Sequence, residues 1–355
     1  MSGLVPSLGL GLLAAVVTAA LCPLLPGLLR RAHLLDAPGD RSSHTVPTPR
    51  GGGLAVLAGA VVAAVAALAL GPAVPVLAGG WVPALAAVGV AAGLIGLVDD
   101  ARGLPPGLRA VLQLLVGTGA GLLVVALDGV SWVWVPVAAV ALAAYVNAVN
   151  FMDGLNTVTG LHAVVTGVAF AVMGVVADAT GPADTEWLLP AGLVVAGVGL
   201  GFLPFNGLSG GPARLFLGDV GSYGLGAMIA FLAGAGFLTG LPLEMALAPL
   251  VVWLADTAHT LVLRMAAGER WYLPHRTHAY QRLTDAGWSH RQVGVAAAGA
   301  TALAAVVATL VAQDALVWRL VGAVALVLLG WAWVKLPAWL GHPSPWGAVA
   351  RARRG

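Results

Sequence analysis

Apolar residues fill most of the chain in long runs, and short polar connections separate these runs. A bilayer core of about 30 Å requires roughly 20 apolar residues for one helical span. Measured against that length, the runs predict about eleven transmembrane helices and an all-α, polytopic integral membrane protein. The predicted spans are Leu4–Leu29, Gly53–Leu70, Trp81–Val98, Ala110–Leu127, Trp132–Ala148, Leu161–Ala177, Trp187–Leu203, Val220–Leu238, Leu243–Met265, Val293–Ala312 and Leu316–Val334.

The composition supports the membrane class. Hydrophobic residues make up 59% of the 355 positions and charged residues only 9%, whereas a soluble domain has about 25% charged residues. So few charges cannot cover a water-soluble surface, which excludes a soluble globular protein. We find no internal repeat and no low-complexity linker, so residues 1–355 are predicted to form a single membrane domain. The single cysteine, Cys22, excludes an intrachain disulfide framework.

Charged residues divide unequally between the two sets of connections. One set receives Arg30, Arg31, Arg41, Arg50, Arg102, Arg109, Arg214, Arg264, Arg270, Arg276, Arg282, Arg291 and the tail from Lys335 to Arg354. The other set receives Arg319 with Asp128, Asp178, Asp184, Glu186, Glu244 and Asp314. Excess Lys and Arg mark the cytoplasmic side of a membrane. We therefore expect the N-terminus outside, the C-terminus in the cytoplasm, and cytoplasmic loops at about 31–52, 99–109, 149–160, 204–219 and 266–291, with a tail at 335–355.

Two adjacent carboxylates, Asp99 and Asp100, follow the third predicted span. Paired carboxylates at a membrane surface repel each other and lose hydration, so they need a compensating cation or basic group. A bound metal or a catalytic role would meet that need. An ordinary interfacial pair, neutralised by Arg102 and Arg109, would meet it equally well.

Two amides and a carboxylate, Asn147, Asn150 and Asp153, come at the inner end of the fifth predicted span, directly before Gly154. If the helix persists, the two Asn side chains share one face at i, i+3 spacing. Such a face suits a polar ligand or a hydrated cation, and the glycine lets the backbone turn close to it. The alternative is helix capping by Asn and Asp.

A Gly-Asp-x-Gly-Ser turn over Gly218–Ser222 opens the eighth predicted span. It combines a carboxylate with the free N–H groups and the positive dipole end of a helix, which is a workable site for a metal-bound diphosphate. The alternative is that Asp219 or Ser222 only caps this helix.

Basic and imidazole side chains gather at His275, Arg276 and His278 in the last long inner loop. They can bind phosphate by charge-assisted hydrogen bonds, although a merely basic loop facing the membrane is the alternative. Asp256 and His259 lie within the ninth predicted span. Ionisable groups there indicate either a functional site or an internal polar pair that holds helices together.

These motifs occur together, in one order and on one face, and they resemble the polyprenyl-phosphate N-acetylhexosamine-1-phosphate transferase family, of the glycosyltransferase family 4 type. The matching segments run from about Asp36 to Tyr280. They are the Pro-Thr-Pro-Arg-Gly-Gly loop at 47–52, the pair at 99–100, Asn-x-x-Asn-x-x-Asp-Gly at 147–154, Pro-Ala-Arg-x-Phe-x-Gly-Asp-x-Gly-Ser at 212–222, and Arg-x-His at 276–278.

The resemblance implies that N-acetylhexosamine-1-phosphate passes from a UDP-sugar to undecaprenyl (polyprenyl) phosphate, with Mg²⁺ as cofactor and Mn²⁺ as a substitute. It implies catalytic roles for Asp99, Asp100 and Asp153, and metal ligation by Asp219 and Asp153. The substrate-binding residues that it implies are Asn147, Asn150, Asn156, Arg214, Phe216, His275, Arg276, His278 and Arg50. The expected location is the bacterial inner membrane, among membrane lipids and with the site facing the cytoplasm. A homodimer is possible, and no nucleic acid partner is expected.

The chain departs from the family pattern at three places. Asn156 and Thr157 replace the second Asp-Gly of the usual Asp-Gly-x-Asp-Gly, and the stretch from Asn206 to Pro212 is longer than usual. Tyr280 and Gln281 stand where consecutive histidines would lie. The last difference predicts a donor sugar without a peptide, as in the branch that begins O-antigen-type glycans. The alternatives are a transporter or flippase of a charged or lipid-linked substrate, and the peptidoglycan phospho-MurNAc-pentapeptide transferase.

Overall fold

The structure is a computed structural model that describes residues 3–36, 46–180, 184–209, 211–270, 275–312 and 316–346. Within these ranges, eleven helical segments are long and apolar enough to cross a membrane. This confirms the predicted all-α, multi-pass class and the predicted number of spans. Part of the first inner loop, including Arg41 and His44, and the basic end of the tail lie outside the described residues.

The helices follow the apolar runs closely. The helices are α1 (Leu4–Leu21), α2 (Leu25–Arg31), α3 (Gly53–Leu70), α4 (Pro75–Ala78), α5 (Trp81–Arg102), α6 (Pro106–Asp128), α7 (Val135–Met152), α8 (Val158–Thr180), α9 (Leu188–Phe202), α10 (Gly218–Leu238), α11 (Leu243–Leu247), α12 (Val251–Ala266), α13 (Ala279–Asp285), α14 (His290–Val311) and α15 (Leu316–Trp339). Two short strands, β1 (Leu35–Asp36) and β2 (Thr48–Pro49), pair antiparallel in the first inner loop.

Some helices extend beyond their apolar runs, and these extensions carry polar residues into the fold. Helix α5 continues to Arg102, so Asp99 and Asp100 belong to its last turns. Helix α14 begins at His290, where Ser289 and Gln292 form a reciprocal capping box. At α14 the hydrogen bonds of this capping box, rather than hydrophobicity, set the boundary.

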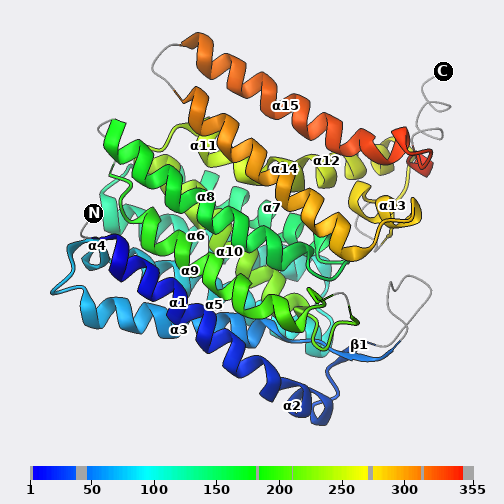
Figure 1. Ribbon diagram of the computed structural model, residues 1–355, viewed down its shortest axis with the longest axis horizontal. Helices are drawn as coiled ribbons and strands as arrows, with labels where there is room; N and C mark the ends of the chain where they lie inside the picture. Colours follow the sequence, from blue (N-terminus) through cyan, green and yellow to red (C-terminus); the bar gives the residue numbers. More distant parts are fainter. Residues whose placement is uncertain are drawn as a thin grey trace.

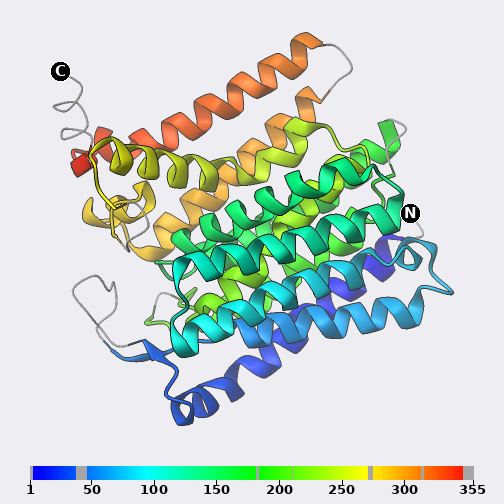
Figure 2. The ribbon, with the colours of Figure 1, turned by 180° about the vertical axis from the view of Figure 1, so that it is seen from behind.

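The long helices run side by side across the molecule, and α10 lies inside the bundle (Figures 1 and 2). Its apolar window is 83% buried, against 28% for α15 on the outside. Helices α5 and α7 pack against α10, and all three bring polar residues to the end of the bundle that carries β1 and α13. At the opposite end, Arg319 of α15 forms a bidentate ion pair with Glu244 of α11, with N–O distances of 2.9 and 3.2 Å.

The packing of α5 against α10 is close because a glycine lies at the contact. A Cβ added to Gly96 would overlap the carbonyl oxygen of Asp219. The absence of a side chain lets the two backbones approach, which brings the end of α5 beside the start of α10. This contact positions two of the acidic motifs relative to each other.

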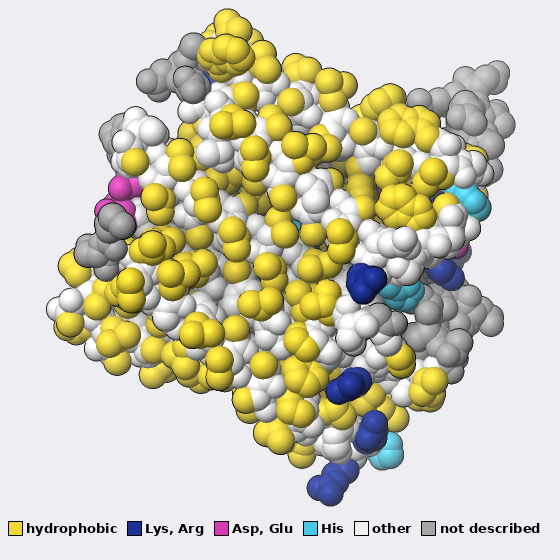
Figure 3. Space-filling view, in the orientation of Figure 1, with side chains coloured by type: hydrophobic (Ala, Val, Ile, Leu, Met, Phe, Trp, Pro, Cys, Tyr) yellow, Lys and Arg dark blue, Asp and Glu magenta, His cyan; other side chains and the backbone are white. Residues whose placement is uncertain are grey.

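Side-chain types are segregated along the molecule. On the face shown in Figure 3, apolar side chains cover the middle, and Lys, Arg and His side chains gather toward the end that carries β1 and α13. Acidic side chains on this face lie at the opposite edge. The two ends therefore correspond to the two sets of connections separated by charge. The direction in which the chain crosses a membrane stays a prediction.

Candidate active site

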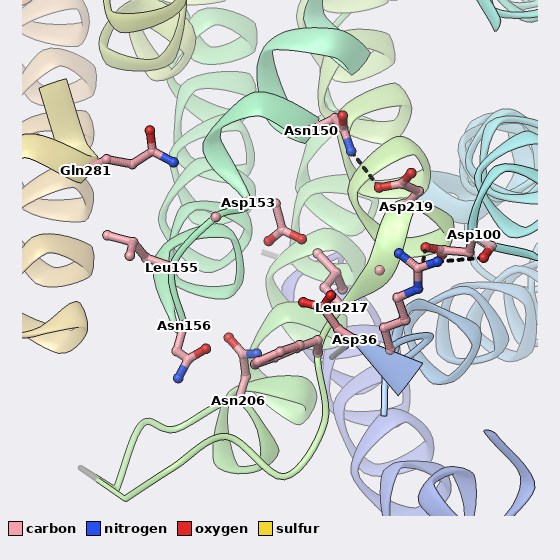
Figure 4. Close-up of a pocket in the computed structure, with 14 residues that line it drawn as sticks. Asp36, Asp100, Asn150, Asp153, Leu155, Asn156, Asn206, Leu217, Asp219 and Gln281 are labelled. Atoms are coloured by element: carbon pink, nitrogen blue, oxygen red, sulfur yellow. Dashed lines mark hydrogen bonds and ion pairs between the residues drawn. The ribbon is translucent and has the colours of Figure 1, made fainter. Parts of the chain in front are cut away.

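A pocket of about 280 Å³ opens at the end of the bundle where α5, α7 and α10 meet (Figure 4). Residues that lie far apart in the sequence line it, which shows that several of the polar motifs converge in space. The lining residues are Asp36, Arg50, Asp100, Asn150, Asp153, Gly154, Leu155, Asn156, Asn206, Phe216, Leu217, Gly218, Asp219 and Gln281.

Asp100 enters the pocket from the last turn of α5. Its Oδ2 accepts a hydrogen bond of 3.1 Å from the backbone N–H of Val220, in the first turn of α10. Arg50 approaches Oδ1 through Nε at 3.5 Å and donates to the Asp100 carbonyl oxygen at 2.7 Å. Oδ1 is buried and accepts no hydrogen bond. This carboxylate therefore retains acceptor capacity toward a cation or a donor in the pocket.

Asp219 lies in the first turn of α10 and faces Asn150 of α7. Asn150 donates from Nδ2 to Asp219 Oδ1 at 2.8 Å and to Ser222 Oγ at 3.1 Å. The N-cap residue of α10 is Leu217, whose side chain makes no capping hydrogen bond, and the Val220 N–H in the first turn donates to Asp100 instead. The capping alternative for Asp219 and Ser222 is therefore wrong. Both residues instead make contacts with α7 at the pocket.

Asp153 follows the last residue of α7 and points into the pocket between Asn156 and Asp219 (Figure 4). Burial, together with the negative charges of Asp219 and Asp100, raises the pKa of Asp153 well above its ordinary value. Burial is the larger of these causes, and the neighbouring carboxylates add to it. Among the residues that line the pocket, Arg50 is the one cation facing Asp36 and these three carboxylates.

The donor set of the pocket fits Mg²⁺. Carboxylate and amide oxygens are the ligands of hard divalent cations, and the buried Oδ1 of Asp100 accepts no hydrogen bond. Among the described residues, no group of three or more His, Cys, Asp or Glu side chains is arranged to hold a metal ion by itself. Mg²⁺ commonly uses one or two carboxylates and completes its shell with water and substrate phosphates. An open, acidic pocket fits this kind of Mg²⁺ coordination better than it fits a structural Zn²⁺ site, which is closed by protein ligands.

A further wall of the pocket is built from the first inner loop and from the segment before α10. Phe216 donates from its backbone N–H to the Pro49 carbonyl at 2.9 Å, and Gly52 donates back to Phe216 O at 2.8 Å. Asn206 accepts from Thr157 N–H at 2.6 Å and donates to Leu215 O at 3.1 Å. These bonds hold the Asn156 and Phe216 segments on one side of the pocket.

Thr157 adopts a left-handed backbone conformation, with φ of 71°. A β-branched residue rarely occupies this region, which glycine enters freely. In the motif that the sequence resembles, glycine stands at this position, and glycine enters this region without strain. The Asn206 bond to Thr157 N–H helps to hold that turn.

Asp99 lies beside the pocket and is absent from its lining. Its Oδ2 accepts from Tyr223 Oη at 2.8 Å and Arg109 at 3.0 Å, and its Oδ1 accepts from Leu104 N–H at 2.7 Å. Both oxygens are therefore engaged. The Asp99–Arg109 ion pair fits the interfacial alternative for this residue, whereas Asp100 faces the pocket.

The predicted phosphate-binding residues of the last inner loop are absent from the pocket lining. His278 is 2% exposed and contacts Asp256 Oδ1 through Nδ1 at 3.2 Å. His275 stacks on the His278 ring at 4.6 Å. Burial, reinforced by the charges of His278 and Arg264, lowers the pKa of His275 to about 3. His275 is therefore neutral near pH 7 in this arrangement.

Three other predicted contacts also point elsewhere. Arg276 lies near Asp285, with an N–O distance of 3.7 Å. Arg214 is exposed and absent from the pocket lining. Asn147 donates to Gln113 Oε1 of α6 at 2.6 Å. The structure thus brings Arg50, Asp100, Asn150, Asp153, Asn156, Phe216 and Asp219 together and leaves Asn147, Arg214, His275, Arg276 and His278 outside the lining.

Three polar lining residues were not among the predicted site residues: Asp36, Asn206 and Gln281. Asp36 ends β1, and Gln281 lies in the first turn of the short helix α13. Asn206 carried a signal, because it precedes the conspicuous glycine-rich stretch before Pro212. Gln281 carried a weaker one, because it stands where consecutive histidines would lie, and the approach of Asp36 to the pocket depends on long-range packing.

Comparison with known proteins shows the family to which the chain belongs. The family model described as glycosyl transferase family 4 matches residues 82–236. A decaprenyl-phosphate N-acetylglucosaminephosphotransferase of Mycobacterium leprae is 31% identical over 324 residues, covering 80% of this chain and 78% of its own. The chain belongs to glycosyl transferase family 4. It is thus a transferase, and the transporter alternative does not hold.

Other glycosyl transferase family 4 relatives span two kinds of enzyme. A probable undecaprenyl-phosphate N-acetylglucosaminyl 1-phosphate transferase of Bacillus subtilis is 26% identical and covers 76% of this chain and 75% of its own. A phospho-N-acetylmuramoyl-pentapeptide-transferase of Moorella thermoacetica is 34% identical over 254 residues, covering 62% of this chain and 73% of its own. The O-antigen assignment stays a prediction.

Proposed function

We propose that this enzyme transfers N-acetylhexosamine-1-phosphate from a UDP-sugar to a polyprenyl phosphate such as undecaprenyl phosphate. An oxygen of the lipid phosphate attacks the phosphorus linked to the sugar and forms a new P–O bond. The bond from that phosphorus to the bridging oxygen breaks, and UMP leaves. The product is a lipid-linked diphosphate sugar that starts a glycan.

The observation that carries this proposal is the convergence of Asp100, Asp153 and Asp219 in one pocket, from three helices whose motifs lie far apart in the sequence. Both reactants are anionic, so the principal catalytic task is to align phosphates and offset their charge. Carboxylates cannot do this alone. They can do it by holding a divalent cation beside Arg50.

Asp219 and Asp153 would hold Mg²⁺, with Asp100 in support. A bound Mg²⁺ would offset charge on the diphosphate and on the departing UMP. Asn150 orients Asp219 through its 2.8 Å hydrogen bond, so its amide acts on the pocket through that carboxylate. Arg50 is 37% exposed at its side chain and supplies positive charge at the rim.

The nucleotide is assigned to the wall formed by Asn156 and Phe216. The Phe216 ring offers a face on which uracil can stack, and the Asn156 amide can pair with the uracil edge. Asp99 is assigned an orienting role at the acceptor side. Since its oxygens already accept three hydrogen bonds and a phosphate dianion is itself nucleophilic, a general base there is unnecessary.

The site is assigned to the cytoplasmic face of a bacterial inner membrane. The basic connections lie at the same end of the bundle as the pocket, and excess Lys and Arg favour the cytoplasmic side. UDP-sugars are cytoplasmic metabolites, so this orientation gives the pocket access to its donor.

The donor is assigned as a UDP-N-acetylhexosamine without a peptide. Two relatives are named for N-acetylglucosamine, which makes UDP-N-acetylglucosamine the first donor to test. The Moorella relative keeps the peptidoglycan transferase as the second candidate. Amino-modified or 6-deoxy donors remain part of the proposal for the O-antigen branch.

The decisive experiment incubates the purified protein with undecaprenyl phosphate and separate UDP-sugars, and measures UMP release. We expect release with a peptide-free UDP-N-acetylhexosamine, loss of activity in EDTA, and recovery on adding Mg²⁺ or Mn²⁺. Efficient turnover of UDP-MurNAc-pentapeptide would instead favour the peptidoglycan reaction. Full activity in EDTA would exclude the proposed metal.

A further inference from the structure

We propose that Tyr280 is a positioning residue for Asp153: it ties the loop that carries this carboxylate to helix α13. The inference rests on the proposed function, in which Asp153 serves the diphosphate. It gives a role to a residue that stands where consecutive histidines would lie.

The hydroxyl group of Tyr280 bridges two backbone groups that flank Asp153. It donates to the Phe151 carbonyl oxygen at 2.9 Å and accepts from the Gly154 N–H at 3.0 Å. Tyr280 is fully buried. Burial raises the pKa of its hydroxyl, so the group stays protonated and able to donate. One side chain therefore holds both ends of the turn from which Asp153 projects.

The close approach of Gly154 belongs to this arrangement. A Cβ at Gly154 would lie 2.5 Å from the Tyr280 hydroxyl oxygen and 3.0 Å from Nε2 of Gln281. A side chain at this position would therefore displace the hydroxyl or the turn. The glycine and the tyrosine fit each other as a pair.

Tyr280 is itself held by a buried anchor. Asp256 of α12, which is fully buried, accepts from Ala279 N–H at 2.8 Å and Tyr280 N–H at 2.9 Å. It also accepts from Trp333 Nε1 of α15 at 3.1 Å. A continuous set of hydrogen bonds thus runs from α15 through α12 and α13 to the turn after α7. This gives Asp256 the structural role that the sequence left open.

The chain supplies a matched control. Tyr145 of α7 is also buried, and its hydroxyl contacts His162 Nε2 at 2.7 Å inside the bundle. Both Tyr280→Phe and Tyr145→Phe remove one buried hydroxyl and keep the ring. A general loss of stability would affect both variants, whereas a positioning role affects Tyr280→Phe alone.

The first measurement needs no substrate. Hydrogen–deuterium exchange of the peptide over residues 151–156 should become faster in Tyr280→Phe, because the Tyr280 oxygen no longer accepts from the Gly154 amide. Exchange there should be unchanged in Tyr145→Phe. If Tyr280→Phe protects this segment as well as the wild type does, the proposal is wrong.

The second measurement is UMP release by the full-length enzyme. We expect Tyr280→Phe to lower kcat by roughly tenfold to a hundredfold, as small displacements of reacting groups do, with a smaller effect on KM for the donor. Tyr145→Phe should keep the wild-type kcat. Faster exchange with an unchanged kcat would make Tyr280 merely structural and overturn the inference.

Gly154→Ala provides an independent variant, which also serves if Tyr280→Phe does not fold. It should lower kcat, because its Cβ meets the Tyr280 hydroxyl oxygen. Combining it with Tyr280→Phe removes that oxygen, so the double variant should lose less than the product of the two single losses. Independent, multiplying losses would count against the pairing. Absence of UMP release by the wild type with every donor would instead sink the proposed function, while the exchange experiment would still test the bridge.

Discussion

At the scale of the residue, Asp219 lies in the first turn of α10 and accepts a hydrogen bond from a side chain of another helix, α7. Asn150 fixes one of its oxygens, and the pocket lies beside it. The neighbouring carboxylates Asp100 and Asp153 belong to the same cavity. A cation bound by such groups depends on their negative charge. Amide and carboxylate side chains are nearly isosteric, so an Asp→Asn substitution removes the charge and keeps the shape.

Asp219→Asn is therefore expected to lower turnover by at least ~100-fold, since it removes charge that the transition state requires. The fold should persist, which a melting curve of the purified variant would check. Asp184→Asn is the matched control, because Asp184 is exposed and outside the pocket lining. UMP release at the wild-type rate by Asp219→Asn would refute the metal assignment.

Most of the acidic residues that line the pocket could be selected from the sequence because each stands out against an apolar background. A carboxylate such as Asp100 or Asp219 at the end of an apolar run is costly without a partner, so its presence carries information. Whether the side chains of Asn147 and His278 face the pocket could not be predicted in this way. Each found a buried hydrogen-bond partner on another helix, Gln113 and Asp256 respectively, and only tertiary packing shows which partner is near.

At the scale of the element, the contact between α5 and α10 determines how the acidic motifs meet. Gly96 lies one turn before Asp100, and its missing side chain admits the Asp219 backbone. The apolar runs predicted both helices but not this contact. Run length reports whether a segment spans a membrane, while helix pairing in lipid depends on small residues and local fit.

Gly96→Ala should force α5 and α10 apart and lower UMP release by about tenfold or more, because small displacements of reacting groups are costly. Gly119→Ala in α6 should have little effect, since a Cβ at Gly119 meets no atom within 4 Å. The two variants make the same chemical change in a membrane helix. Equal activities would show that the close contact does not position the site.

At the scale of the whole molecule, charge is the feature that orients the bundle. The pocket, with its own buried carboxylates, lies at the end where the exposed Lys, Arg and His side chains gather. The sequence predicted this polarity because loop charges are visible without a fold. The structure adds that the pocket and the basic end coincide.

Single cysteines at Ser209 and Ser131 should test the orientation directly. Both serines are exposed, and they lie in connections at opposite ends of the bundle. A membrane-impermeant maleimide should label Ser131→Cys in intact cells, and Ser209→Cys only after the cytoplasmic face is opened. The native Cys22 is buried and gives a low background. Labelling of Ser209→Cys from outside would invert the proposed topology.

The hydrogen bond between Asp100 and Val220 N–H joins residues that are 120 positions apart. At ribosomal speed this interval corresponds to on the order of ten seconds of synthesis. During that time α5 has already left the ribosome, while the helix that supplies the partner of its carboxylate does not yet exist. The early helices therefore wait in the membrane without this one partner of Asp100, although Arg50 is already present. A nascent chain acquires its pocket only when α10 arrives, so incomplete chains have no site with which to bind the donor.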